Sequence, residues 1–290
     1  MSQYDDVDVV VKRYHQDYVY GQDKILFNGN NHYNDEEIEQ PADYFDVLDQ
    51  GNTKNWIDKF HTRGVDFHMM TLDEQDLYWM KKAYVLGMQT RRTSHIFDDE
   101  LENTYQKHKH LMPPGQWFVR TDLVSLKEGV HGIGPYDDFK KVLESMISTS
   151  AGHGCFRSTH TSCNIYFMKW IDIDADLEFR VFVYNNRVTA LSSQHLYSIN
   201  DTLKGMTDDG IKSIVKQVLR YFDEVVKHRM EYMGSYTMDL AFTKEKQPYF
   251  IEPNSFGKYY AAGSGLYHWI YDHDTLHETD SIEVRFVHDY

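Results

Sequence analysis

The chain has 290 residues, enough for one large domain or two smaller ones with a sizeable buried core. Its 41% hydrophobic and 26% charged residues are ordinary for a globular protein and exclude wholesale disorder. With 30 basic against 45 acidic side chains, the net charge of −15 argues against non-specific binding to nucleic acid or to an anionic membrane.

The negative charge is concentrated at the front of the chain. Residues 1–76 hold 6 basic and 17 acidic side chains, and the remaining residues hold 24 and 28. The later part is therefore close to neutral, so the charge disfavours a polyanionic ligand only at the front segment.

Two cysteines, Cys155 and Cys163, are too few for a disulfide framework and predict a reducing compartment. No stretch approaches the roughly 18 apolar residues that span a bilayer. The apolar run Val9–Val11 is too short for a signal peptide. Together these features predict a soluble, cytoplasmic protein with no membrane partner.

The chain up to residue 112 predicts a helical and irregular region. From Asn55 to about Arg92 the apolar spacing is helical, and Thr71 followed by Glu74 matches a capping box. Residues 93–112 are polar and rich in histidine, and they end at the turn signal Pro113-Pro114-Gly115.

After this break, strand and helix patterns alternate. A strand is expected at Trp117–Val119, followed by a glycine-bearing loop at Lys127–Gly134 and a helix capped by Asp137 or Asp138. The later elements are expected to be a strand at 164–171, a hairpin over 178–192, a helix at 208–230 and a hairpin over 236–252. This order predicts an α+β domain of the catalytic type from about residue 113.

The final hairpin carries the densest polar signal. Strand alternation places Asp239 on the face opposite Met238 and Leu240, and pairing of the two strands would bring Glu252 beside it. Asn254 follows two residues later on the same face. Two carboxylates and an amide oxygen suit Mg²⁺ bound with a nucleotide's phosphates, although a solvent-exposed face of a two-stranded ribbon fits the same spacing.

A second cluster is basic and comprises Arg120, Lys127 and, beside Glu178 in the middle hairpin, Arg180. Cations that project from strands toward a glycine-rich loop suit phosphate groups, which arginine binds with two hydrogen bonds. The glycine run itself matches neither the dinucleotide nor the Walker pattern, and an ordinary loop with exposed charges is the alternative. His131 in this loop could face either a substrate or solvent.

Four further side chains, those of His153, Cys155, His160 and Cys163, are of the types that bind Zn²⁺. Their spacing is not a usual zinc pattern, and Cys163 is expected to enter a strand. Two neighbouring glycines add hinge freedom, which favours a mobile loop over a nucleotide instead.

Several segments together resemble the Cdc123 (D123) family. They are Phe167–Ile171, Glu178–Val183, Met238–Leu240, Ile251–Gly257 and Ser264–Trp269. The segment Phe118-Val119-Arg120 with Ser125-Leu126-Lys127 is similar to the Arg/Lys signature of a related clade of divergent ATP-grasp proteins, also found in bacteriophages and large viruses. The resemblance covers about residues 113–270, and the order and spacing of the motifs make it fairly specific.

The resemblance implies an ATP-grasp fold, in which two α+β lobes hold ATP between them. The nucleotide-binding domain would be residues 113–290, and the acidic residues 1–112 would form a divergent substrate-side lobe. Phosphate contacts and catalysis would fall to Arg120, Lys127 and Arg180. The adenine would lie beside Lys169, Trp170 and Ile171, and Glu178 and Arg180 would lie near the ribose and phosphates. The implied Mg²⁺ ligands are Asp239, Glu252 and Asn254.

Two positions depart from Cdc123 itself: Glu252 stands where that family favours aspartate, and Arg120 stands where it has lysine. Both point toward the viral-type clade or ordinary ATP-grasp ligases, and a viral protein would act in the host cytoplasm. The leading hypothesis is an ATP- and Mg²⁺-dependent ligase that activates a carboxylate as an acyl phosphate for attack by an amine.

Two alternatives stay open. In one, the acceptor is RNA, joined at its ends or modified at a base, for which Arg91, Arg92, Lys107 and Lys109 offer a local basic patch. In the other, the chain is a non-catalytic, ATP-binding assembly chaperone like Cdc123. The sequence does not identify the acceptor, whether protein or peptide, small amine or RNA, because variable segments build the substrate side of such folds.

Overall fold

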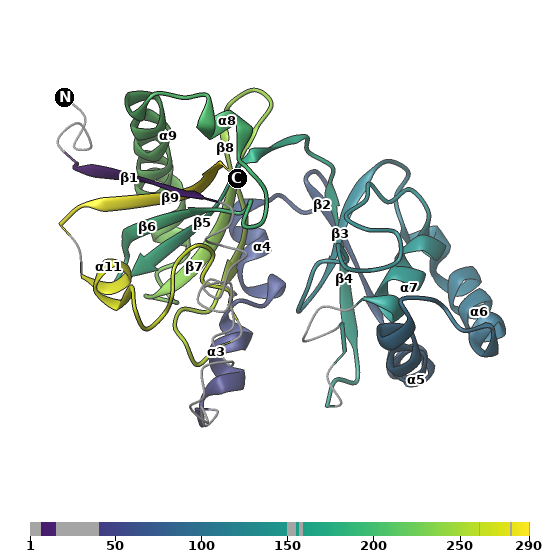
Figure 1. Cartoon of the computed structure of the whole chain (residues 1–290). Helices are drawn as coiled ribbons and strands as arrows, with labels where there is room; N and C mark the ends of the chain where they lie inside the picture. Colours follow the sequence, from purple (N-terminus) through teal and green to yellow (C-terminus); the bar gives the residue numbers. More distant parts are fainter. Residues whose placement is uncertain are drawn as a thin grey trace. The chain divides into compact units, whose positions relative to one another are not determined.

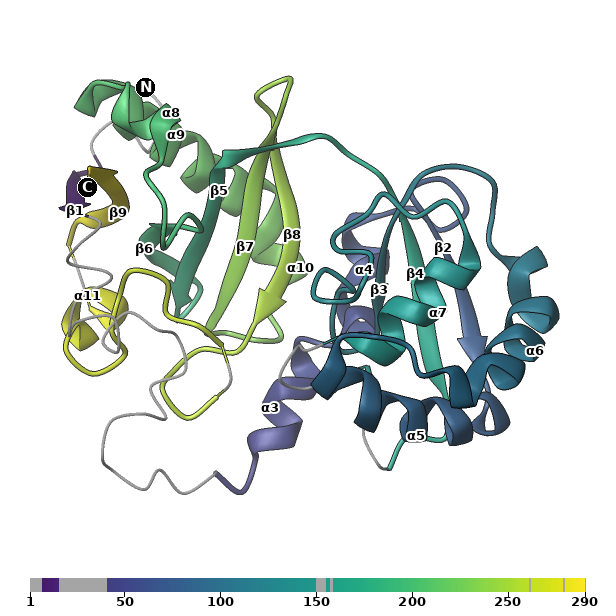
Figure 2. The same cartoon turned by 45° about the vertical axis from the view of Figure 1, so that its right-hand side comes forward.

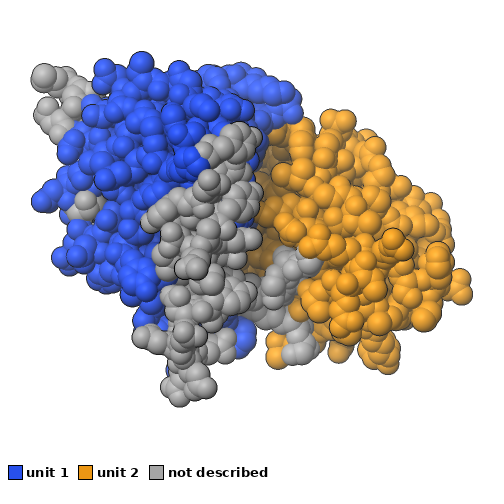
Figure 3. Space-filling view, viewed as in Figure 1, with its two compact units in different colours: residues 1–51, 172–290 blue, residues 52–171 orange. Residues whose placement is uncertain are grey.

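The computed structural model describes residues 7–15, 41–149, 155–156, 159–260, 262–278 and 280–289. The chain divides into two compact units, one of residues 1–51 with 172–290 and one of residues 52–171, which are coloured separately in Figure 3. The predicted boundary at residue 113 therefore falls inside the second unit. The reason is that strands from both sides of residue 113 belong to one sheet in that unit.

The first unit is built on a six-stranded sheet with the strand order β1-β9-β6-β5-β7-β8 (Figure 1). Strand β9 runs parallel to β1 and β6, and the other neighbours are antiparallel. The strands are β1 (Val9–His15), β5 (Ile173–Tyr184), β6 (Arg187–Ser193), β7 (Tyr236–Thr243), β8 (Pro248–Asn254) and β9 (Ile282–Asp289). Both predicted hairpins, β5–β6 and β7–β8, are confirmed.

Local turn chemistry explains the first hairpin. Asn185 and Asn186 both have positive φ angles, 48° and 58°, which a two-residue hairpin turn needs to match the twist of its strands. Asparagine adopts this left-handed conformation more readily than most residues. The turn therefore sets the register that brings β5 and β6 together.

The helices of the first unit are α3 (Tyr44–Gln50), α8 (Asp201–Lys204), α9 (Asp208–Tyr221), α10 (Lys227–Arg229) and α11 (His273–His277). The predicted long helix is confirmed: Thr207 caps the start of α9 by accepting from the Gly210 amide, and a π-helical turn at Phe222–Val226 joins it to α10. Helix α9 contacts the two edge strands β1 and β8, and Figure 2 shows it crossing behind the sheet. Helix α11 contacts β5 and β6.

The front of the chain is less irregular than its composition predicts. Residues Val9–His15 form β1, which pairs in parallel with β9 near the end of the chain. The apolar run at Val9–Val11 is thus part of a sheet edge. A single short strand whose partner lies more than 250 residues away has no local signal that sequence periodicity can detect.

The second unit has a three-stranded sheet in which β2 (Phe67–Leu72) and β3 (Trp117–Thr121) each pair antiparallel with β4 (Cys163–Lys169). Its helices are α4 (Thr53–Phe60), α5 (Glu74–Thr90), α6 (Asp98–His108) and α7 (Phe139–Ser148), with short 3-10 turns at His95–Phe97 and Lys109–Leu111. None of the helices in the described parts of the chain is long and apolar enough to cross a membrane.

The helical pattern expected from Asn55 to Arg92 is correct at both ends and wrong in the middle. Residues Phe67–Leu72 form strand β2, and Thr71 lies inside it, where its hydroxyl donates to Asn164 Oδ1 on β4 at 2.7 Å. The helix is capped instead by Asp73, whose carboxylate accepts from the Asp76 amide. A hydrogen bond from Lys107 lowers the pKa of Asp73 to about 2.

Residues 93–112, for which the sequence predicted no particular element, contain helix α6 (Asp98–His108). Its polar sequence buries little apolar surface, and its buried residues are Leu101, Thr104 and His108. The contacts that hold it include His108 Nε2, which lies 2.7 Å from the buried Asp76 carboxylate on α5. Polar contacts to a distant helix leave no helical apolar pattern in the sequence.

The predicted strand at β3 and the helix α7 are confirmed. Asp138 caps α7 by accepting from the Lys140 amide at 2.9 Å. The expected inner face is fully buried and consists of Phe139, Val142, Leu143, Met146 and Ile147. A local cap and one apolar stripe were therefore sufficient to place this helix.

Helix α5 packs unusually closely against the end of α7 at Gly87. A Cβ atom at Gly87 would lie 2.0 Å from the Ile147 carbonyl oxygen, which is far inside van der Waals contact. Only glycine permits this approach, since the obstacle is backbone and cannot rotate away.

We predict that Gly87→Ala lowers the free energy of unfolding by about 1–3 kcal/mol, because the new methyl group forces the two helices apart. The matched control is Gly210→Ala in α9, where the nearest atom to the added Cβ is 3.5 Å away. That control should be neutral or stabilising by up to about 1 kcal/mol. Urea unfolding of both variants tests this, and equal behaviour would contradict the close packing.

Candidate functional site

One face of the six-stranded sheet carries polar side chains at directly paired positions on five neighbouring strands. The register pairs Arg285 with Ser192, Ser192 with Arg180, Arg180 with Asp239, and Asp239 with Glu252. Directly paired residues place their side chains on the same face, about 5 Å apart. We call these five residues the cross-sheet row.

An ion pair between Arg180 on β5 and Asp239 on β7 lies at the centre of this row. Arg180 Nε donates to Asp239 Oδ1 at 2.9 Å, and Nη2 donates to Oδ2 at 2.8 Å. The two side chains are only 15% and 4% exposed. A bidentate pair at this burial is held in one geometry, because both groups need each other to offset the loss of water.

Three other segments of the first unit converge on the ion pair. Gln194, just after β6, donates to Asp239 Oδ1 at 2.8 Å, and Asn254 at the end of β8 donates to Oδ2 at 3.5 Å. The third nitrogen of Arg180 donates to the Gly263 carbonyl oxygen at 2.8 Å. The pair therefore ties together the ends of β6 and β8 and the segment after β8.

Three carboxylates act on Arg180. Burial lowers the pKa of Arg180, but the carboxylates of Asp239, Glu252 and Glu178 outweigh this and raise it above its ordinary value. Glu178 precedes Arg180 by two residues on β5 and therefore lies on the same face. One guanidinium and three carboxylates thus lie close together at this end of the row.

The donor atoms at this place are of the kind that Mg²⁺ prefers, although no three His, Cys, Asp or Glu of the described residues are placed to hold a metal ion. Asp239, Glu252 and Asn254 offer oxygen ligands, which Mg²⁺ requires, and the contact from Asn254 to Asp239 uses the amide nitrogen and leaves the amide oxygen. Thr237, paired with Asn254 on the same face, has a buried hydroxyl with no hydrogen-bond partner in the described part of the chain. Buried hydroxyl groups ordinarily have a hydrogen-bond partner. A bound water or ligand group next to Thr237 would supply one.

The other end of the row is closed by a second buried network. Arg285 on β9 pairs with Asp272 through two hydrogen bonds of 2.9 and 2.7 Å, and its guanidinium lies 3.9 Å from the Tyr267 ring centroid. Ser192 accepts from the Leu266 amide at 2.9 Å. Arg285 Nε also donates to Glu283 Oε1 at 2.6 Å. Because these groups satisfy one another, Arg285 and Ser192 anchor the segment 264–272 against the sheet.

In the second unit, Arg120 on β3 lies on the sheet face opposite the layer of α5 and α7. It is 2% exposed, its Nε donates to Thr53 Oγ1 at 2.9 Å, and its guanidinium lies 4.8 Å from the Trp56 ring. Both partners come from α4. A cation–π contact with Trp56 and the Thr53 hydroxyl thus position Arg120. None of these contacts tests whether Arg120 binds phosphate, so that role stays a prediction.

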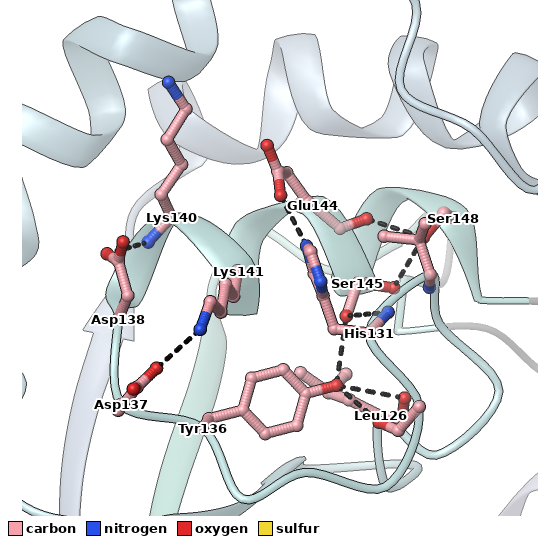
Figure 4. A network of polar contacts seen from close by, with 12 residues as sticks. Leu126, His131, Tyr136, Asp137, Asp138, Lys140, Lys141, Glu144, Ser145 and Ser148 are labelled. Carbon is pink, nitrogen blue, oxygen red and sulfur yellow. Dashed lines mark hydrogen bonds and ion pairs between the residues drawn. The ribbon is translucent and has the colours of Figure 1, made fainter.

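The predicted glycine-bearing loop follows β3 and lies against α7 (Figure 4). Two loop amides are taken by serine hydroxyls of α7: Val130 N donates to Ser148 Oγ at 3.0 Å and His131 N donates to Ser145 Oγ at 3.3 Å. His131 Nε2 lies 2.5 Å from a Glu144 carboxylate oxygen, so its ring is directed to the helix. These amides are therefore engaged within the protein, and Lys127, which is exposed, is the loop's candidate for an anion.

The predicted adenine-side residues lie where the chain leaves one unit for the other. Lys169 is the last residue of β4, and its amide donates to the Asp66 carbonyl at 2.8 Å. The Trp170 amide donates to the Gln116 carbonyl at 3.2 Å. The second unit ends at Ile171. Strand β4 therefore ends at Lys169, whereas the sequence predicted that it continues to Ile171. Trp170 and Ile171 belong to a short connection.

The zinc alternative gains no support from the described residues. Cys163 enters β4 as expected, and both cysteines are buried and free. Burial raises the pKa of Cys155 to about 12, which disfavours the thiolate that zinc requires. No group of three His, Cys, Asp or Glu in the described ranges could hold a metal ion. His153 and the two glycines of the proposed hinge, Gly152 and Gly154, lie outside those ranges.

Besides Ser192 and Arg285 of the cross-sheet row, sequence reasoning missed three groups around the central ion pair: Gln194, Thr237 and the Gly263 carbonyl. Gln194 has the same strand parity as Ser192, so extending the alternation by two residues beyond the predicted strand would have found it. Thr237 follows from the same alternation on β7. The Gly263 carbonyl had no signal, because a backbone contact from a loop depends on the tertiary path of the chain.

Solved structures with the same arrangement of elements define the class of fold. Cdc123 from Schizosaccharomyces pombe matches with a TM-score of 0.55 at 12% identity, over 83% of this chain and 97% of that chain. Its C-terminally truncated form matches over the same shares with a TM-score of 0.54. D-alanyl-alanine synthetase A from Vibrio cholerae O1 biovar eltor str. N16961 reaches only 0.31 at 13% identity, over 70% and 52%, which does not establish a shared fold.

The chain is thus an α+β protein with the fold of Cdc123. The D123 family model matches residues 137–290, which is more than half of the sequence and includes the whole cross-sheet row. The chain therefore belongs to the D123 family. Among curated protein sequences, none matches it.

We predict that Asp239→Asn lowers the free energy of unfolding by about 3 kcal/mol, because it leaves the buried Arg180 without its bidentate counter-ion. Glu245→Gln, an exposed carboxylate in the turn of the same hairpin, serves as the control and should change stability by less than about 0.5 kcal/mol. Chemical unfolding of both variants is the measurement. Equal stabilities would mean that the ion pair does not hold this part of the sheet.

Proposed function

We propose that the chain binds Mg·ATP through the acidic end of the cross-sheet row and uses it as an ATP-dependent ligase of the ATP-grasp type. The observation that supports this is the cluster of Arg180 with three carboxylates, those of Glu178, Asp239 and Glu252, on one sheet face. Carboxylate oxygens are the ligands that a divalent cation such as Mg²⁺ prefers, and a fixed guanidinium beside them suits phosphate.

Each residue of the row's acidic end has a proposed role. Asp239, Glu252 and Asn254 would hold Mg²⁺, which would neutralise charge on the ATP phosphates. Arg180 would stabilise charge on the transferred phosphoryl group from a position that the ion pair has already fixed. Glu178 would lie near the ribose and phosphates.

From the second unit, Arg120 and Lys127 are proposed to contact phosphates. The connection Lys169–Ile171 is proposed to lie beside the adenine. These roles rest on the family resemblance of their motifs. The exposed side chain of Lys127 in the glycine-bearing loop supports its assignment, since an anion can reach it from solvent.

The hydrogen bonds that Asp239 already accepts affect how a metal ion can bind to it. Both of its carboxylate oxygens already accept hydrogen bonds, from Arg180, Gln194 and Asn254. A metal ion must compete with the guanidinium for these oxygens. We therefore expect Mg²⁺ to bind together with the nucleotide, whose phosphates offer Arg180 a second anionic partner, and only weakly alone.

The proposed chemistry needs no nucleophile from the protein. A substrate carboxylate oxygen attacks the γ-phosphorus of ATP, the bond to the β-phosphate oxygen breaks, and ADP leaves with an acyl phosphate formed. An amine then attacks the acyl carbon and releases inorganic phosphate. The protein's part is to place the reactants and stabilise charge, and the cross-sheet row supplies the charged groups for that task.

We predict that Glu252→Gln weakens Mg·ATP binding by about tenfold or more, since one hard-oxygen anion is lost from the metal site. Glu252 is half-buried and is the register neighbour of Asp239 rather than of Arg180, so the variant should keep the central ion pair and its fold. Isothermal titration with Mg·ATP measures the change, and Glu245→Gln is again the control. Unchanged affinity in Glu252→Gln would contradict the proposed metal site.

A second candidate function is an ATP-binding assembly protein without turnover. Membership of the D123 family and the shared fold with Cdc123 favour it. The two candidates share Mg·ATP binding and differ in whether the bound ATP is consumed.

We predict that incubation of the protein with labelled ATP and fractionated lysate yields ADP and phosphate, as acyl-phosphate chemistry requires. Production of AMP would point to adenylylation instead. Absence of any ATP consumption, with Mg·ATP binding intact, would replace the ligase by the assembly protein. The Arg180→Met variant is the control for turnover by a contaminant.

The RNA acceptor is the weakest of the alternatives. One of the four cations of its basic patch, Lys107, is already paired with Asp73 and Asp76 at 2.9 and 3.0 Å. A carboxylate and an amine are therefore the proposed reacting groups. If the protein bound an oligonucleotide with an affinity that falls steeply with salt, an RNA acceptor would become the favoured hypothesis.

Within the family, we propose that this chain is most similar to the viral-type clade. The reason is that Arg120 and Glu252 stand where Cdc123 itself favours lysine and aspartate. A protein of that clade would act in the cytoplasm of a host cell.

A further inference from the structure

One stretch of the second unit combines positive charge with exposed apolar side chains, and the proposed nucleotide site uses none of it. From residue 77 to residue 97 the sequence holds four cations, Lys81, Lys82, Arg91 and Arg92, and no aspartate or glutamate. The whole chain has 45 acidic side chains and a net charge of −15. A stretch of this length without a carboxylate is therefore an exception in an acidic protein.

The same stretch exposes an unusual share of the large apolar side chains. Of the fifteen that are exposed in the described part of the chain, five lie here: Tyr78, Val85, Leu86, Met88 and Ile96. Tyr78 and Val85 are seven residues apart, so they lie on one side of α5, and they are 66% and 55% exposed. Single exposed apolar residues need no explanation, whereas a cluster of them marks a surface that contacts another molecule.

Three cations beside these apolar residues form no ion pair with a carboxylate of the described residues. Lys82 lies between Tyr78 and Val85 on the same side of α5 and donates to the Tyr78 hydroxyl at 2.7 Å. Arg91 and Arg92 are exposed at the end of α5, where a cation also stabilises the helix dipole. We call Tyr78, Lys82, Val85, Leu86, Met88, Arg91 and Arg92 the α5 surface.

Helix α3 of the first unit has the complementary composition. Phe45, Asp46 and Asp49 are three and four residues or one residue apart, so they share one side of the helix. Phe45 is 55% exposed, and Asp46 and the preceding Asp43 are exposed as well. Residues 41–50 hold three carboxylates and no cation. We call Asp43, Phe45 and Asp46 the α3 surface.

We propose that the α5 surface of one copy of this chain docks on the α3 surface of a second copy. Phe45 would pack against Val85 and Leu86, and the carboxylates of the α3 surface would pair with Arg91 and Arg92. Opposite charges bring such surfaces together and fix their register, while the aromatic ring supplies the apolar contact. Every copy carries both surfaces, so a dimer with two-fold symmetry would contain the contact twice.

A second copy fits the α5 surface better than other occupants do. The surface needs a partner with carboxylates around an apolar side chain, and α3 of this chain presents that combination. Nucleic acid offers the negative charge without the apolar contact of Phe45. An anionic membrane would have to approach a protein whose net charge is −15.

The test is sedimentation velocity of the full chain over roughly a hundredfold range of concentration, at low and at high salt. We expect self-association that weakens at high salt. The double variant Arg91→Glu, Arg92→Glu should weaken it about tenfold or more, because two attractions become repulsions. The matched control is Lys54→Glu with Arg63→Glu, which changes the net charge equally at two exposed cations of the same unit and should associate like the wild type.

An exchange of charges then identifies the two surfaces. Asp43→Lys with Asp46→Lys should also weaken self-association, since its α3 surface then repels the α5 surface. Mixed with the Arg91→Glu, Arg92→Glu protein, it should form a heterodimer, because both contacts again join opposite charges. Urea unfolding checks that each variant is folded. A wild type that stays monomeric at every concentration, or a mixture of folded variants that does not associate, would overturn the proposal.

Discussion

The ion pair between Arg180 and Asp239 is the constraint on which the first unit depends. Both groups are nearly buried, so each would be costly to leave without the other. They meet only because β5 and β7 pair in one register, and a shift of one residue would turn Arg180 to the opposite face. The same two side chains hold Gln194, Asn254 and the Gly263 carbonyl. A single interaction thus aligns several segments and places three carboxylates beside a fixed cation.

The atoms that stabilise the sheet at this place are also those of the proposed nucleotide site. The carboxylates of Glu178 and Glu252 act on Arg180 beside this ion pair, and the proposed Mg·ATP site rests on this acidic group. In the second unit the cations are held differently: Arg120 lies against Trp56, and serine hydroxyls occupy two amides of the glycine-bearing loop. That loop therefore offers an anion the Lys127 side chain rather than a cradle of free backbone amides.

The most accurate sequence predictions concern residues close together in the chain. Asp239 and Glu252 were expected side by side because a hairpin and strand alternation determine their positions, and the register pairs them directly. Helix α7 followed from its cap and one apolar stripe. The failures have the opposite cause: β2 has a partly helical apolar spacing and becomes a strand because β4 pairs with it, and α6 is held by a polar contact to α5.

The two hairpins, the helices α7 and α9 and the acidic group on the final hairpin could be read from the amino-acid sequence, since each depends on neighbours within about twenty residues. The pairing of Arg180 with Asp239, the pairing of β1 with β9 and the sheet shared by residues on both sides of 113 became known from the folded chain alone. Pairing between distant strands is selected by the summed burial and hydrogen bonding of the whole sheet. No local pattern of residues encodes that sum.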